Sequence, residues 1–342
     1  MKKKESDNYV CPSSLKKLNL EIFKEENDVV IEGILVSEDK IIFPIKKGIP
    51  DLTWPQELQK IDEETRKAYD KLAIDYDKYA SIPFQTYNCD EILVRQKMIE
   101  QLNIKTGDNI LEVGCGDGRG SEQIAEKLNN SGKLYLQELS PSFLNKALER
   151  LKKYEKNIEI EYSVANACYL SFPDNFFDAA HHFGGINTFS DVKRSLSELS
   201  RVVKPGGKVL VGDESMAPWL RETMFGKIMM NSNPLLKYEI PLKDIPTNAR
   251  DVKLEWIMMG AFFILEFTVG EGEPEANYHI NIPSERGGNH WTRFFGNLEG
   301  ITDETKKLAY QAQKKSGLSM HEWLDKIVKE ESVKFLDKEN NI

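Results

Sequence analysis

A run of glycines beside two acidic residues is the part of this sequence best suited to chemistry. The run reads Gly114-Cys115-Gly116-Asp117-Gly118 and follows a predicted buried strand at 109–113. Glycines let the backbone turn sharply and let a ligand approach without a Cβ in the way. Arg119 stands where a nicotinamide-binding loop would place its third glycine, so this spacing disfavours a nicotinamide dinucleotide.

Two carboxylates end neighbouring predicted strands next to this loop. Glu112 lies two residues before the first glycine, and Glu138 ends a strand predicted at 133–137. A carboxylate at Glu112 would repel a pyrophosphate but suits a cofactor with ammonium and sulfonium cations, a difference on the order of several kcal/mol. Glu138 lies where an open α/β sheet places a ribose-binding carboxylate. Asn166 and Ala167 end the third strand of the same series.

The segment 108–214 alternates strand and helix patterns, which predicts a parallel sheet covered by helices. Strands are predicted at 109–113, 133–137, 158–162, 177–181 and 208–212, and helices at 121–128, from 142 onward and at 192–202. The fold class is therefore expected to be α/β, with a doubly wound Rossmann-like sheet.

The flanking regions follow other patterns. A small β-rich module is expected from short apolar runs at 20–23, 29–31, 34–36 and 41–44, and helices are expected over 57–103. After the alternating segment, the sequence predicts a helix near 217–230 and two strands over 254–269. A polar glycine-rich stretch follows at 270–300, and a helical tail is expected at 302–336. In the tail, Ser319 and Glu322 have the spacing of a capping box. The expected domains are 1–56, 57–270 and 271–342.

Composition narrows the class of protein. The 342 residues are 40% hydrophobic and 30% charged, an ordinary globular balance, and the formal net charge of −9 disfavours duplex nucleic acid as a partner. The four cysteines are scattered, so neither a disulfide framework nor a zinc site is expected. No apolar signal segment or membrane span is predicted, and a cytoplasmic location is expected.

The segment 65–215 resembles the class I S-adenosylmethionine-dependent methyltransferases, in particular the ubiquinone/menaquinone group. Besides the glycine loop, the resemblance rests on 69–77 and on the turn at 201–207, Arg-Val-Val-Lys-Pro-Gly-Gly. The resemblance implies S-adenosylmethionine as the cofactor. Glu138 would bind the ribose, at a position where the family more often has Asp. Asn166 would contact the adenine edge, at a position where the family usually has Asp. The cofactor-binding residues implied are Glu112, Gly114, Cys115, Gly116, Asp117, Gly118, Glu138, Leu139, Asn166 and Ala167.

A second resemblance concerns the N-terminus. The stretches 11–14, 43–45 and 48–52 are similar to the zinc-ribbon-like domain that activates tRNA and protein methyltransferases. A ribbon needs four thiolate or imidazole ligands, but Ser14 replaces the second cysteine and no other Cys or His precedes Cys89. The module is therefore expected to be a metal-free scaffold.

Several residues are candidates for acting on a substrate. His181 and His182 end the fourth strand, where at most one of them should face the ligand crevice; the alternative is that both are satisfied, half-buried imidazoles. Asn187 is a similar candidate or a loop cap. Substrate contacts are expected from Tyr76, Tyr79, Arg286, His290 and Arg293, the last three in the loop 282–296, which is otherwise a surface hairpin or a subunit contact.

The expected function is direct, in-line methyl transfer to a small organic molecule, quinone-like or another secondary metabolite. Proximity and desolvation supply most of the rate in such a reaction. One alternative is an RNA methyltransferase guided by a basic face of the N-terminal module, with Lys16, Lys17, Lys46 and Lys47. Another is a cofactor-binding regulator or partner subunit without turnover. The C-terminal helices are candidates for homo-oligomerisation.

Overall fold

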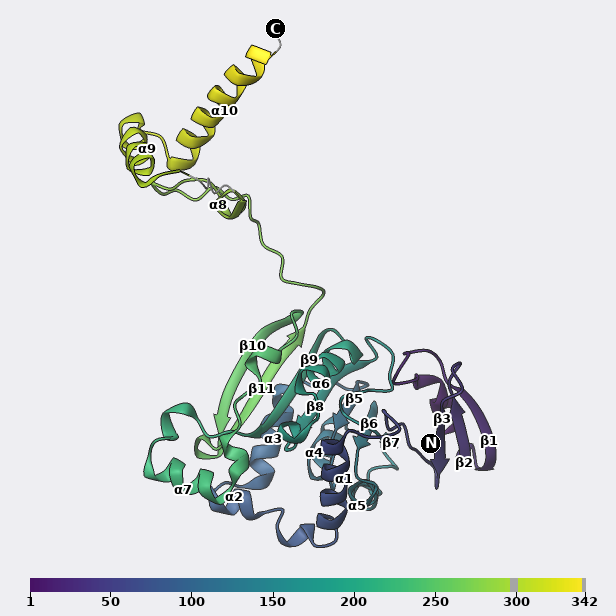
Figure 1. Cartoon of the computed structure of the whole chain (residues 1–342). Coiled ribbons are helices and arrows are strands. Elements are labelled where there is room, and N and C mark those ends of the chain that lie inside the picture. Colours follow the sequence, from purple (N-terminus) through teal and green to yellow (C-terminus); the bar gives the residue numbers. More distant parts are fainter. Residues whose placement is uncertain (296–300, 340–342) are drawn as a thin grey trace. The chain divides into compact units, whose positions relative to one another are not determined.

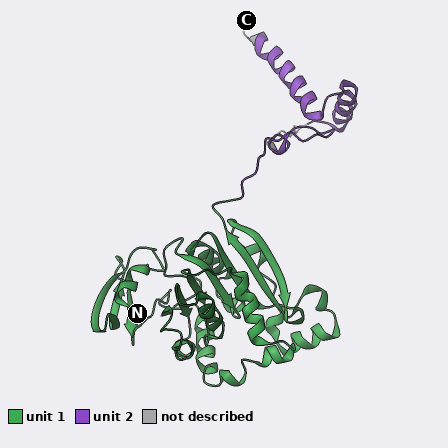
Figure 2. Cartoon of the chain, turned by 180° about the vertical axis from the view of Figure 1, so that it is seen from behind, with its two compact units in different colours: residues 1–273 green, residues 274–342 purple. Residues whose placement is uncertain are grey.

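The computed structural model describes residues 1–295 and 301–339, which divide into two compact units, 1–273 and 274–342 (Figures 1 and 2). The first unit contains both the N-terminal module and the α/β core. The second contains three helices and is described by itself below.

A seven-stranded sheet forms the centre of the first unit, in the order β10-β11-β9-β8-β5-β6-β7. Its strands are β5 Asn109–Val113, β6 Lys133–Glu138, β7 Glu159–Val164, β8 Phe177–Phe183, β9 Val203–Glu214, β10 Ala249–Ile257 and β11 Phe262–Val269. Strands β5 to β9 are parallel, whereas β11 is antiparallel to β9 and the outermost strand β10 is antiparallel to β11. The predicted α/β fold is confirmed. Because β5 pairs with both β6 and β8, the strand order reverses at β5, where such sheets bind ligands.

The helices that cover this sheet are α3 Glu91–Gln101, α4 Arg119–Leu128, α5 Pro141–Leu151 and α6 Val192–Val202. The predicted helix at 192–202 is confirmed, and it buries Leu196, Leu199 and Val202 on one face. Side chains of Ser140 and Asp191 accept hydrogen bonds from the first turns of α5 and α6, which is why these helices begin where they do.

A helical segment leads into the core and lies against the edge of the sheet that binds ligands. It comprises α1 Lys60–Leu72, the short helix η2 Tyr76–Lys78 and α2 Ile82–Thr86. Helix α1 contacts α5 and the turn η3 Ile186–Thr188. The helical pattern predicted for 57–103 is therefore confirmed for these elements. The segment 60–86, called the strap below, lies beside the strand ends.

The N-terminal module is a four-stranded antiparallel sheet preceded by the short helix η1 Lys3–Asn8. Its strands are β1 Asn19–Glu26, β2 Val29–Val36, β3 Ile42–Lys46 and β4 Ile49–Pro50. The division of β2 into two runs was wrong: the strand continues through Gly33, where a Cβ would lie 2.6 Å from the carbonyl oxygen of Glu21. Gly33 therefore permits the close approach of β1 rather than ending a strand.

The module and the α/β core share one apolar interior. The amide of Leu52 donates to the carbonyl of Val164 at 2.8 Å, so the chain after β4 pairs with the outer strand β7. The ring of Phe172 lies 5.3 Å from that of Tyr9 in the module and 5.5 Å from that of Tyr135 in β6. The described structure thus joins the module to the edge of the main sheet.

The remaining elements differ from expectation in one place. The helix predicted near 217–230 is present but begins later than expected: a turn of 3-10 helix, η4 Pro218–Leu220, precedes α7 Met224–Ser232. The hydroxyl of Thr223 accepts from the amide of Gly226 and so starts a new helix. Short helices η5 Pro234–Lys237, η6 Leu242–Asp244 and η7 Met258–Gly260 complete this unit.

The second unit contains α8 His290–Phe295, α9 Asp303–Ser316 and α10 Met320–Glu339. The helical tail is confirmed, and so is the capping box, because Ser319 and Glu322 exchange side-chain-to-backbone hydrogen bonds at 2.9 and 3.3 Å. The predictions for 296–300 and for the end of the tail at 340 lie outside the described residues. Within the described ranges, no helix is both long and apolar enough to cross a bilayer.

Candidate active site

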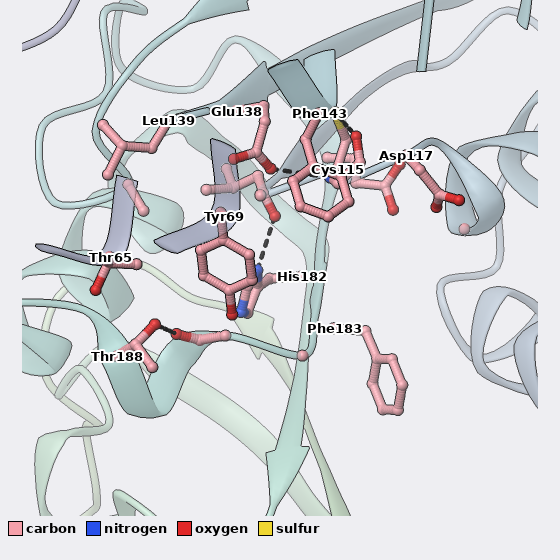
Figure 3. Close-up of a pocket in the computed structure, with 18 of the residues that line it drawn as sticks. Thr65, Tyr69, Cys115, Asp117, Glu138, Leu139, Phe143, His182, Phe183 and Thr188 are labelled. Atoms are coloured by element: carbon pink, nitrogen blue, oxygen red, sulfur yellow. Dashed lines mark hydrogen bonds between the residues drawn. The ribbon is translucent and has the colours of Figure 1, made fainter. Parts of the chain in front are cut away.

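A cleft of about 950 Å³, including its open mouth, lies at the carboxyl ends of β5, β6, β7 and β8 (Figure 3). All the predicted cofactor-binding residues line it except Gly118. A Cβ on Gly118 would lie 3.1 Å from the Cα of Ala147, so this glycine allows α4 and α5 to approach each other. The predicted residues lie together in this cleft because the carboxyl ends of parallel strands meet at one edge of the sheet.

The glycine loop presents bare backbone to the cleft. Gly114 has φ +62°, and a Cβ there would lie 3.1 Å from the ring of His182. Gly116 has φ +55°, and a Cβ there would meet nothing within 4 Å. The first glycine thus makes room for a histidine, and the second leaves space that a ligand can fill.

Glu138 is held in place by the backbone of the loop. One carboxylate oxygen accepts from the amide of Gly116 and the other from the amide of Ser140, both at 2.9 Å. Burial raises the pKa of Glu138, and these amides counteract the rise. Each oxygen keeps a lone pair, so the carboxylate can still accept hydroxyl hydrogen bonds from a ribose.

Glu112 lies at the end of β5, and its two oxygens have different partners. Oε2 accepts from the hydroxyl of Ser121 at the start of α4, and Oε1 lies 3.1 Å from Nδ1 of His181. In the part of the chain that the structure describes, neither Glu112 nor Glu138 has a lysine or arginine nitrogen within 4.0 Å. The cleft thus offers negative charge that suits a cation and repels a phosphate.

The two histidines of β8 face opposite sides, as the strand geometry predicts. His182 lines the cleft and His181 does not. Nδ1 of His182 donates to the carbonyl of Val113 at 2.7 Å, which leaves Nε2 unprotonated, buried and without a partner among the described residues. Burial lowers the pKa of His182 to about 4, so this imidazole is neutral at physiological pH.

Asn166 lines the cleft, but its side chain has protein partners. Its amide nitrogen donates to Asp62 of α1 at 3.0 Å, and its carbonyl oxygen accepts from the amide of Cys168 at 3.0 Å. Asp62 also accepts from the hydroxyl of Ser190 at 2.7 Å. The predicted contact of Asn166 with the adenine edge stays a prediction; the structure shows Asn166 joining α1 to the loop after β7.

Of the other predicted substrate and catalytic residues, some line the cleft and others do not. Tyr76 lines the cleft, whereas Tyr79 does not and is half exposed. Asn187 does not line the cleft either; its side chain donates to the carbonyl of Glu214 at 2.7 Å, which is the loop-capping alternative. Arg286, His290 and Arg293 belong to the second unit, so their proposed contact with a substrate stays a prediction.

Cys115 is buried, and burial together with the nearby carboxylates Glu138 and Glu112 raises the pKa of its thiol well above its usual value. It therefore packs under the loop as a protonated thiol rather than as a nucleophile. The described residues contain no group of three or more His, Cys, Asp or Glu side chains placed to hold a metal ion.

Sequence reasoning missed several residues that line the cleft. Asp62, Thr65 and Tyr69 come from α1, Arg95 from α3 and Phe143 from α5. Tyr69 lay within the segment that carried the family resemblance and was therefore open to prediction. Arg95 carried no such signal, because its place depends on how α3 packs against the sheet.

Comparison with known proteins agrees with this geometry. Residues 58–224 match the model of the ubiE/COQ5 methyltransferase family. The ubiquinone/menaquinone biosynthesis C-methyltransferase of Francisella tularensis subsp. novicida is 32% identical over 117 residues, which cover 34% of this chain and 47% of the relative. The 2-phytyl-1,4-naphtoquinone methyltransferase of Trichormus variabilis is 33% identical over 119 residues, or 35% of this chain and 52% of the relative.

Among solved structures, phosphoethanolamine N-methyltransferase 2 of Haemonchus contortus, in complex with S-adenosylmethionine, aligns with a TM-score of 0.48 and 16% identity over 67% of this chain and 63% of that one. Residues 58–224 are thus similar to the class I S-adenosylmethionine-dependent methyltransferases of the ubiquinone/menaquinone group. The chain spans about half the length of the curated relatives that it matches.

The residues present fit the cofactor that this family implies. Glu138 accepts from the amide of Gly116, beside the open space there, and Glu112 lines the same cleft. Glu112 would hold the ammonium end of S-adenosylmethionine, and Glu138 would hold its ribose hydroxyls. A pyrophosphate would instead meet two unneutralised carboxylates.

Proposed function

We propose that this chain catalyses the transfer of a methyl group from S-adenosylmethionine to a small, largely apolar acceptor. The observation that carries the proposal is that one cleft contains two carboxylates with no lysine or arginine nitrogen within 4.0 Å among the described residues, together with a neutral histidine whose Nε2 has no partner there. When bound, S-adenosylmethionine supplies an electrophilic methyl group on a sulfonium. The acceptor then needs a place beside that methyl group and a means of losing a proton.

His182 is the proposed proton acceptor. Its ring lies 4.8 Å from that of Phe189, and its hydrogen bond to Val113 fixes which nitrogen carries the proton. Nε2 can therefore accept a proton from a hydroxyl or an enol of the acceptor. In an aromatic diol or enol, loss of that proton raises the electron density of the oxygen and of the ring carbons that attack the methyl group.

The walls around His182 favour an apolar, aromatic acceptor. Phe183, Phe189 and Tyr69 line this part of the cleft. Burial raises the pKa of Tyr69, so its phenol remains protonated and does not compete as a base. The names of the curated relatives, which concern quinone biosynthesis, support a quinone-like acceptor as the more specific proposal.

The RNA alternative has less support. It requires a positive face on the N-terminal module, but Lys16 pairs with Glu38 and Lys17 pairs with Asp7, both at 2.8 Å. These pairs neutralise two of the four lysines on which that face depended, and phosphate binding relies on cations that are free to replace counterions.

The test uses methyl-labelled S-adenosylmethionine and a fractionated cell extract that contains the native acceptor. We expect label in the small-molecule, solvent-extractable fraction with the natural chain and none with Gly116→Arg, whose side chain would fill the open space in the loop. Label that enters only RNA would support the RNA alternative. Cofactor binding without any label in any fraction would support a regulator without turnover, and equal label with both chains would contradict the site.

A further inference from the structure

One positively charged side chain in the cleft has no role in the proposal so far. Arg95 lies on α3, and its side chain is 14% exposed. Its Nε donates to Glu91 at 2.9 Å, whereas its two terminal nitrogens have no hydrogen-bond partner among residues 1–295 and 301–339. The cleft thus contains a guanidinium whose outer edge is free.

The guanidinium is held in a fixed position. Besides its bond to Glu91, it lies 5.4 Å from the ring centre of Phe84 and 6.0 Å from that of Phe183. Contacts of this kind stabilise a cation over an aromatic face and restrict its motion. Arg95 therefore presents Nη1 and Nη2 to the cleft without first having to become ordered.

Arg95 and Glu112 both line the cleft, and both approach Gly120 at the start of α4. A Cβ built on Gly120 would lie 2.6 Å from Oε1 of Glu112 and 3.7 Å from Nη1 of Arg95. The two groups do not form an ion pair within 4.0 Å. The cleft is thus lined by two opposite charges that are near each other without being paired.

The second arginine of the cleft is already paired. Nε of Arg119 donates to Asp117 at 2.9 Å, and its Nη2 lies 3.2 Å from Asp77. Arg119 also approaches Glu91 at 3.6 Å. Its charge is therefore shared among three acids, which leaves Arg95 as the better placed cation for an incoming anion.

We infer that Arg95 binds the α-carboxylate of the cofactor's amino-acid end while Glu112 binds its α-ammonium, an inference that rests on the proposed function. The two charges of an α-amino acid stand on one carbon, so a site that binds both needs opposite charges close together but unpaired. The terminal nitrogens of an arginine form two parallel hydrogen bonds with a carboxylate. Arg95 and Glu112 together thus recognise a zwitterion.

The test compares two ligands by titration calorimetry on the full chain. S-Adenosylhomocysteine carries both charges, and its decarboxylated analogue keeps the ammonium but lacks the carboxylate. For Arg95→Met we expect affinity for S-adenosylhomocysteine to fall about 10- to 100-fold and affinity for the decarboxylated analogue to change less than about 2-fold. Arg95→Lys should restore part of the loss.

Two further variants complete the design. Lys97→Met removes a cation from the exposed side of the same helix, where the lysine pairs with Glu255, and should change neither affinity. Glu112→Gln should weaken both ligands, because both carry the ammonium. Thermal unfolding of each variant shows whether the fold is retained.

The outcomes separate this inference from the proposed function. If Arg95→Met weakens both ligands equally, or weakens neither, Arg95 does not bind the carboxylate and the inference is overturned, while the cofactor assignment stands. If the natural chain binds neither ligand, the cofactor assignment and the inference fail together.

Discussion

At the scale of single residues, the functional residues that the sequence could predict are those at the ends of strands. Glu112, Glu138 and His182 could be placed because the carboxyl ends of parallel strands meet at one edge of a sheet. The partner of Asn166 could not be predicted, because it is Asp62, from a helix more than a hundred residues earlier in the chain. The free edge of Arg95 depends in the same way on packing between distant elements.

Replacing His182 tests its role as a proton acceptor. His182→Asn removes the basic nitrogen but keeps an N–H that can donate to the carbonyl of Val113. We expect the rate of methyl transfer to fall about 10²- to 10⁴-fold, while affinity for S-adenosylhomocysteine changes little. Single-turnover kinetics and calorimetry measure the two quantities separately; a parallel loss of both would mean that His182 only shapes the cleft.

The lowered pKa of His182 also makes stability depend on pH. The folded-state pKa is about 4, against an ordinary value of 6.5. Below pH 6.5 the unfolded chain binds a proton that the folded chain does not, so stability falls as the pH drops toward 4. Relative to His182→Asn, the natural chain should lose about 3 kcal/mol of unfolding free energy between pH 7.5 and pH 4. Urea unfolding of both chains measures the difference, and curves that stay parallel would contradict the low pKa.

At the scale of elements, local patterns predicted the sheet and most helices but not the contacts between remote segments. The apolar runs 29–31 and 34–36 were expected separately, whereas they form one strand in which Gly33 allows β1 to approach closely. The helix at 217–230 contains no proline after Pro218, yet Thr223 starts a new helix there by capping Gly226. The helical pattern of α1 and η2 was predicted, but nothing local shows that the side chains of Asp62 and Asp70 attach α1 to the core.

Removing one of these attachments should release the strap. Asp62 is buried and accepts from Asn166 and Ser190, so Asp62→Ala leaves the buried amide of Asn166 without this partner, at a cost of about 1–3 kcal/mol. We expect faster amide hydrogen exchange in 60–72 and weaker binding of S-adenosylhomocysteine. Glu63→Ala, next to it but exposed and paired only with Lys67, is the matched control. Unchanged exchange in α1 would show that Asp62 does not hold it.

At the scale of the whole molecule, the division of the chain differs from the division suggested by composition. The expected boundary at 56 separates segments that share a hydrogen bond between Leu52 and Val164 and a common aromatic cluster, so 1–273 is one compact unit. The expected boundary near 270 lies close to the observed one at 273. The second boundary lies in a polar stretch, whereas the first lies between a module and a core that pack against each other.

This division predicts that the first unit is sufficient for binding the cofactor. A chain of residues 1–273 should bind S-adenosylhomocysteine within about 2-fold of the full chain, since every residue that lines the cleft lies within it. If Arg286, His290 and Arg293 contact the acceptor, the same truncation should raise the KM for the acceptor. An unchanged KM would contradict that role, and a large loss of cofactor affinity would contradict the completeness of the first unit.

The aspartates of the strap also bear on turnover. Besides Asp62, Asp70 of α1 accepts from the hydroxyl of Ser140 at 2.6 Å, so α1 lines the cleft and is bonded to the two loops that are proposed to hold the donor. We expect departure of the demethylated donor to require these hydrogen bonds to break and therefore to be slower than chemistry. Rapid-quench experiments should then show a burst of methylated product equal to the enzyme concentration, followed by a slower steady state that Asp70→Ala accelerates. A linear time course from the first turnover would mean that α1 imposes no such delay.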